Sequence, residues 1–156
     1  MKRTILISIV FGALVVAPAL GQTITTVGAG GVFPAGTTFN GVPLNGLQSG
    51  YGIQIESTGS ATGQFCTILL GVTALGAPRN IAVVGKASSG SRTAANVATF
   101  SGTCTIDMGD GSAPLLGVPF TAAITTNSSD QGTIGLTLGL NTLPTATVNQ
   151  GSMSIR

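Results

Sequence analysis

The feature that most constrains the fold of this chain is an alternation of apolar with small or polar residues at a period of two. Between 100 and 108, Phe100, Cys104 and Ile106 share one face, and Thr103 and Thr105 lie on the other. The same alternation recurs at 118–124 and 132–140, and in shorter form at 53–55, 81–83 and 153–155. Such segments, rich in Thr and β-branched residues and interrupted by Gly, Pro, Asn and Asp, are typical of β-strands. Strands this closely spaced favour an antiparallel sandwich or barrel. Of these we expect the sandwich, an all-β, single antiparallel, Ig-like or jelly-roll-like domain of about seven or eight short strands.

The two cysteines of the chain occur in related segments, CTILLG at 66–71 and CTIDMG at 104–109. Each lies beside an Ile and a Leu or Met on an alternating face, so we expect both side chains to point into the core. Two cysteines in an exported chain usually pair. We therefore predict a Cys66–Cys104 disulfide. A zinc site is not expected, because such sites need about four ligands and the chain has no histidine.

The segment 64–70 is apolar on both faces. Cys66, Ile68 and Leu70 share one face, and Phe65 and Leu69 share the other. A strand of this kind is normally covered on both sides. We expect the second face to be covered by the N-terminal segment or by another subunit.

Two segments lack the clear alternation. Residues 22–50 are rich in Gly and contain the turn-forming pairs Asn40-Gly41 and Asn45-Gly46. We expect this part of the single domain 22–156 to be loop or edge strand packed on the sandwich. Residues 87–96, ASSGSRTAAN, are expected to form an exposed loop.

The first 21 residues have the pattern of a secretory signal peptide. Lys2 and Arg3 precede an apolar run from 5 to 17, and Ala19-Leu20-Gly21 matches the small-residue site that a signal peptidase cleaves, here before Gln22. The apolar run is too short to span a bilayer as a helix. We therefore expect a mature protein without a membrane span that is secreted, extracellular or in the cell envelope (periplasm or cell surface).

Without Lys2 and Arg3, four Lys and Arg remain against four Asp and Glu, so the mature chain has no net charge. Binding to nucleic acid needs several clustered cations, and no such cluster is present in the sequence. A chain of low and balanced charge lacks the repulsion that keeps monomers apart. The expected partner is therefore the protein itself or an extracellular or cell-wall surface, with carbohydrate as a further possibility.

The chemistry-bearing residues are few. Asp107 and Asp110 resemble part of a calcium loop, but the remaining ligands of an EF-hand are missing and Asp110-Gly111 is a common turn pair. They remain weak candidates for a cation site, and we expect no cofactor. Without histidine a serine nucleophile lacks its usual base, and Glu56 and Asp107 would act together only if the fold joined them. We therefore expect no catalytic residues and no enzyme activity.

Tyr51 and Phe39 are the best candidates for aromatic platforms that stack on a sugar. The alternatives are thus two. The first is a non-catalytic structural or interaction protein, such as a matrix, coat or fibre component, and the second is a small ligand- or carbohydrate-binding β-sandwich module.

Overall fold

The computed structural model describes residues 21–156, and all the regular structure in this range is β-strand. The strands are β1 (Gln22–Val32), β2 (Thr38–Phe39), β3 (Val42–Ile55), β4 (Ala61–Val72), β5 (Pro78–Ala94), β6 (Val97–Asp107), β7 (Leu115–Thr126), β8 (Gly132–Leu138), β9 (Asn141–Thr142) and β10 (Ala146–Ile155). The all-β prediction is confirmed. The proposed signal peptide falls almost entirely outside the described residues.

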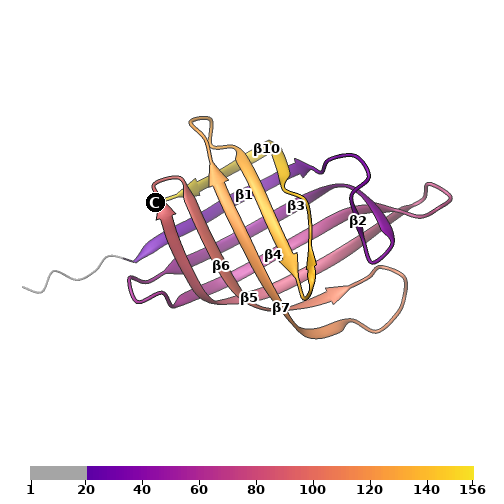
Figure 1. The fold of residues 1–156 in the computed structure, drawn as a ribbon, viewed down its shortest axis with the longest axis horizontal. Helices are drawn as coiled ribbons and strands as arrows, with labels where there is room; N and C mark the ends of the chain where they lie inside the picture. Colours follow the sequence, from indigo (N-terminus) through magenta and orange to yellow (C-terminus); the bar gives the residue numbers. More distant parts are fainter. Residues whose placement is uncertain (1–20) are drawn as a thin grey trace, which may run out of the picture.

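The strands form one antiparallel sheet that closes on itself. Strands β3 to β8 are neighbours in sequence order, and β10 follows beside β8. Strand β1 then pairs with β10 on one side and with β3 on the other. Eight long strands thus surround a common interior as a barrel, with β6, β7 and β8 crossing in front of β1, β3, β4, β5 and β10 (Figure 1). The predicted two-sheet sandwich is wrong, because alternation defines an inner face for each strand but not whether those faces belong to one sheet or two.

The inward faces are the apolar faces that the alternation predicts for most strands. Phe100, Cys104 and Ile106 of β6 are buried, as are Phe120 of β7 and Leu136 of β8. An eight-stranded barrel is just wide enough for side chains to fill it. Aromatic rings from Phe65, Phe100 and Phe120 meet in this interior, with ring centroids 5.2 to 6.1 Å apart.

The face of β4 that turns into the barrel is the opposite of the predicted one. Phe65, Thr67 and Leu69 are buried, whereas Cys66 is exposed and Ile68 is half-buried. Both faces of this strand are apolar, so its own pattern does not define the inner one. The Phe65 ring determines which face of β4 is the inner one, because this large side chain packs with the other rings inside the barrel.

Residues 22–50 are part of the barrel wall and do not pack on it as a separate layer. They supply β1 and the first half of β3, and β1 is the strand that closes the sheet. Segment 87–96 is also mainly strand. It continues β5 up to Ala94. The Ser89 hydroxyl of this segment hydrogen bonds with the Ser101 hydroxyl of β6 at 2.8 Å. Both segments were difficult to predict because their glycines and serines lack an apolar alternation.

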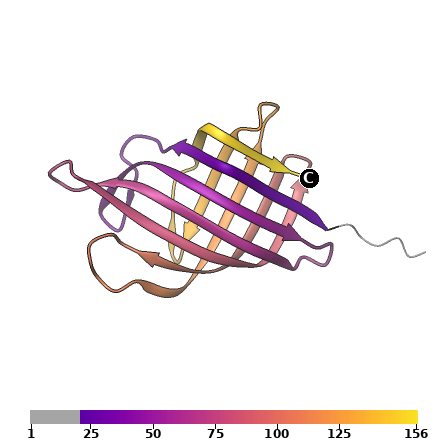
Figure 2. The ribbon, with the colours of Figure 1, turned by 180° about the vertical axis from the view of Figure 1, so that it is seen from behind.

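The connections divide between two ends of the barrel. The terminal end holds the start of β1, the C-terminus and turns 56–60, 95–96 and 127–131; the loop end holds connections 33–41, 73–77, 108–114 and 139–145. Figures 1 and 2 show the C-terminus and the start of β1 together at one end of the barrel and the larger loops at the other. Within residues 21–156 no helix is long and apolar enough to cross a membrane.

Candidate functional site

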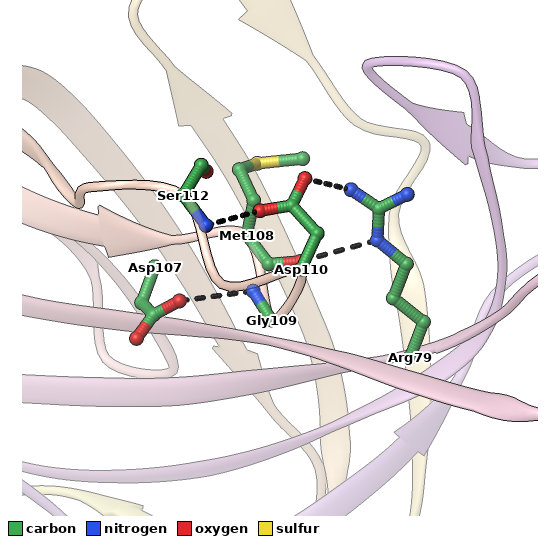
Figure 3. Close-up of polar contacts among 6 residues, drawn as sticks. All are labelled: Arg79, Asp107, Met108, Gly109, Asp110 and Ser112. Atoms are coloured by element: carbon green, nitrogen blue, oxygen red, sulfur yellow. Dashed lines mark hydrogen bonds and ion pairs between the residues drawn. The ribbon is translucent and has the colours of Figure 1, made fainter.

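The main polar network of the loop end is formed by the connection from β6 to β7. Asp107 Oδ1 accepts a hydrogen bond from the Gly109 N–H at 2.9 Å, and Asp110 Oδ1 accepts one from the Ser112 N–H at 3.0 Å (Figure 3). Gly109 has a φ of 64°, and a Cβ there would lie 2.2 Å from the Asn80 carbonyl oxygen. The two aspartates therefore shape consecutive turns of this loop, as Asp side chains commonly do.

Arg79, at the start of β5, ties this loop to the neighbouring strand. Its Nε donates to the Met108 carbonyl oxygen at 3.2 Å, and its Nη2 donates to Asp110 Oδ2 in an ion pair (Figure 3). The hydroxyl and backbone N–H of Ser112, followed by the charge of Arg79, hold the pKa of Asp110 below its usual value. The sequence carries no signal for this role of Arg79, because its partner lies 31 residues away.

In this arrangement both carboxylates already have partners, which disfavours a metal site. Asp110 is already paired with a guanidinium, and Asp107 is committed to its own turn. Among the described residues no group of three or more His, Cys, Asp or Glu side chains is placed to hold a metal. Asp107 and Asp110 are neighbours in the structure, as in the sequence, but their contacts are those of a structural loop.

The predicted disulfide is absent, and both cysteines are free thiols. Cys66 faces Val84 of β5 across the sheet, and Cys104 faces Gly85, so β5 separates the two cysteine strands. Strands separated by one neighbour are about 9 to 10 Å apart. Cys66 is exposed on the outer face and Cys104 is buried on the inner face. A disulfide needs Cα atoms within about 7 Å and Cβ atoms that face each other, so this geometry excludes it.

The two thiols differ in their surroundings. Burial raises the pKa of Cys104, which keeps this group a neutral thiol inside the barrel. Cys66 instead lies beside a shallow hollow of the outer wall, lined by Gly28, Gly50 and Ile68 among others. Its thiol is open to solvent, whereas that of Cys104 is not.

Neither proposed aromatic platform is on the surface. Tyr51 is 6% exposed and Phe39 is 2% exposed. Tyr51 belongs to the interior ring cluster, with its ring centroid 5.8 Å from that of Phe100. Both rings are therefore occupied in packing, and neither is free to stack on a sugar.

The buried hydroxyl groups of the interior differ in whether they have a hydrogen-bond partner. Ser49 and Thr67 face each other across β3 and β4, and their hydroxyl groups hydrogen bond at 2.7 Å. The buried Tyr51 hydroxyl has no hydrogen-bond partner among the described residues, and burial raises its pKa far above the usual value. These polar atoms lie within a packed core and do not form a constellation with an acid or a base.

The carboxylates considered for catalysis are not brought together. Glu56 lies in the first turn of the terminal end, where its carboxylate accepts a hydrogen bond from Ser60 at 2.9 Å. Asp107 ends β6 at the loop end. The length of the barrel therefore separates them, and they cannot flank one bond of a substrate.

The structure shows two exposed apolar surfaces on the barrel. The first, here called the outer stripe, consists of Cys66, Ile68 and Leu70 of β4 with Ala82 and Val84 of β5. The second is a set of exposed side chains at the loop end: Val32, Leu75, Leu115, Leu116 and Leu140. The doubly apolar pattern at 64–70 indicated the outer stripe. For the loop end, the alternation at 132–140 wrongly placed Leu140 on an inner face, and no pattern indicated the rest of the set.

Comparisons with known proteins give no assignment. No family model matches this chain, and no curated protein or solved structure matches it significantly. The function must therefore be inferred from the chain's own surfaces.

Proposed function

We propose that this chain is a non-catalytic, exported structural or interaction protein, a component of a matrix, coat or fibre of the cell surface. It works through contacts of its outer wall with further copies of itself or with an extracellular or cell-wall surface. The N-terminal pattern at 1–21 supports export, and the absence of histidine from the sequence and the separation of Glu56 from Asp107 support a non-catalytic role.

The observation that carries the proposal is the outer stripe. Val84 is 51% exposed, and its cross-strand neighbour Cys66 is exposed beside it. Ile68 and Ala82 are half-buried partners one step further along the same two strands. The strands beside β4 are β3 and β5, and the N-terminal segment lies within the wall, so none of these elements covers the stripe. An uncovered apolar surface of this kind is characteristic of a contact site.

Charge favours the same interpretation. Within the proposed mature chain four cationic and four anionic side chains balance, so copies do not repel each other at long range. The closed sheet has no long free edges, and association by edge pairing is therefore not expected. The contact must be made by side chains of the wall.

The test is light scattering of the purified mature protein across a concentration series. We expect mass to increase with concentration, and we expect Val84→Lys to remove most of this association by placing a charge within the stripe. Thr121→Lys is the matched control, since it adds the same charge to an exposed position of β7, two strands away from β5. A wild-type monomer at every concentration that also fails to bind cell-wall or matrix preparations would contradict the proposal.

A further inference from the structure

The exposed large apolar residues are unevenly distributed over the barrel. Leu75 is 96% exposed, Leu116 is 78% exposed and Leu140 is fully exposed. Leu115 and Val32 are also close to half exposed. All five lie in or beside the connections of the loop end, and the loops of that end project from the barrel in Figures 1 and 2.

The terminal end has the opposite character. Its turns read ESTGS at 56–60, AN at 95–96 and NSSDQ at 127–131, without a large apolar residue. Glu56, Asp130 and Arg156 also lie at this end. The molecule is therefore polarised along the barrel, with a polar, charged end and an end whose projecting side chains are leucines.

The turn that carries Leu75 satisfies several of its own backbone polar groups. Around Leu75, the Thr73 and Gly76 N–H groups donate to the Ala77 and Thr73 carbonyl oxygens at 2.8 and 2.9 Å. The Ala77 N–H donates to Thr73 Oγ1 at 3.1 Å. Leu140 lies in the tight connection between the paired residues Leu138 and Asn141. Such closed turns can enter an apolar phase at a lower cost than open loops, because unsatisfied backbone groups are what lipid excludes.

The cation beside these loops is neutralised by an ion pair, whereas the Asp107 carboxylate keeps its negative charge. Arg79 is paired with Asp110, and Asp107 accepts the Gly109 N–H. Without an unpaired cation in its loops, this end has no means of attracting anionic lipid headgroups or phosphates. Any attraction to a membrane must therefore come from the leucines.

We propose that the loop end attaches the protein to a lipid bilayer surface, by inserting Leu75, Leu116 and Leu140 into the headgroup–acyl boundary. A second copy is the less suitable occupant, because a stable dimer buries about 20–30 residues on each partner in a complementary surface. Five apolar side chains spread over four connections, two of them the adjacent Leu115 and Leu116, do not provide such a surface. A fluid lipid phase surrounds projecting side chains without prior complementarity. The inference rests on the proposed function, since it names lipid as the surface that the protein contacts.

The experiment uses single-tryptophan reporters, because the sequence contains no tryptophan. Leu75→Trp, Leu116→Trp and Leu140→Trp each place an apolar fluorophore at the loop end, and Ser128→Trp is the matched control in an exposed turn of the terminal end. With vesicles of pure zwitterionic phosphatidylcholine, we expect the three loop-end reporters to shift to shorter wavelength and to be shielded from an aqueous quencher. The control should remain unchanged. No shift at the loop end, or equal shifts at both ends, would overturn the proposal.

Vesicle co-sedimentation provides the second readout on the tryptophan-free protein. We expect Leu75→Asn, Leu116→Asn and Leu140→Asn each to lower vesicle partitioning about tenfold, the fold-change of removing one inserted leucine. Partitioning should not weaken between low and high salt, nor strengthen when anionic lipid is added. Strong dependence on salt or anionic lipid would contradict insertion by leucines.

The two proposals fail separately. Val84→Lys should leave vesicle binding unchanged while it disrupts association through the outer stripe. If the wild type does not bind vesicles and the leucine variants instead disperse its oligomers, the loop end is a protein contact and the lipid proposal is wrong. If vesicle binding is found without any association of the wild type, it is self-association through the stripe that fails.

Discussion

Cys66 and Cys104 show how one residue's environment depends on which face of its strand turns inward. They occupy similar local sequences, yet one thiol faces solvent beside Val84 and the other faces the barrel interior. Phe65 accounts for the difference, because its ring occupies the interior and directs its neighbour Cys66 outward. The two thiols thus differ in their accessibility to reagents, although both are reduced.

We predict that a thiol reagent labels one cysteine per native chain quickly and the second only after unfolding. Cys66 is the accessible thiol, whereas the burial of Cys104 and its raised pKa suppress its thiolate. Cys66→Ser should abolish the fast phase, and Cys104→Ser should leave it intact. If the unfolded, unreduced protein had no free thiols, the geometry described for β4 and β6 would be wrong.

The β6–β7 connection shows how an element without regular structure is held in one conformation. Asp107 and Asp110 each accept a backbone N–H from two residues further on, and Arg79 joins the loop to β5. The ion pair itself is exposed, with side chains 27% and 37% accessible, and solvent screening therefore leaves it a small contribution to stability. Several such weak contacts together position Leu115 and Leu116 at the loop end.

We predict that Ser112→Ala raises the pKa of Asp110 toward its usual value by more than Arg79→Met does. The Ser112 side chain makes the largest contribution to the lowered pKa, ahead of the charge of Arg79. Because the native pKa is depressed, the stabilising contribution is present above the unfolded-state pKa of about 4 and is lost as pH falls through the lower native value. Carboxylate titration by NMR gives the measurement, with Asp107→Asn as the control that should leave the order unchanged. Equal pKa values in all variants would contradict the assigned contacts.

At the scale of the whole molecule, closure of the sheet determines the barrel architecture. Strand β1 pairs with β10 and β3, bringing Ile24 beside both Ile155 and Ile53. Closure removes the two exposed edges that β3 and β10 would otherwise present to other chains. It also requires close approach where β1 meets β3, since a Cβ on Gly46 would lie 2.4 Å from the Gly31 carbonyl oxygen.

We predict that Gly46→Ala lowers the free energy of unfolding by about 1–3 kcal/mol, the usual cost of overpacking. Gly50→Ala is the matched control in the same strand. A Cβ at Gly50 would meet nothing within 4 Å, so we expect a change within about 0.5 kcal/mol. Urea unfolding measures both, and amide exchange should show faster opening of β1 in the Gly46 variant. Similar stabilities of the two variants would mean that this contact does not limit closure.

The sequence by itself determined the strand class and the inward faces wherever apolar residues alternate with polar ones. In β6, β7 and β8 most of the predicted positions, such as Phe100, Phe120 and Leu136, are buried, whereas Leu140, which the alternation at 132–140 placed on the same face, is exposed. A period of two is a local property, and it therefore needs no knowledge of distant neighbours. The turn role of Asp110-Gly111 was predictable for the same reason.

Only the tertiary structure decided how those strands are assembled. The pairing of β1 with β10 joins residues such as Ile24 and Ile155, which share no local signal, and this pairing makes a barrel where a sandwich was expected. In β4, where both faces are apolar, the ring cluster of the assembled core selected the inner face and so separated Cys66 from Cys104. The leucines came together at one end because antiparallel strands of a closed sheet return their alternate connections to the same end. Each of these outcomes depends on contacts between residues far apart in sequence, and the alternation within a strand carries no information about them.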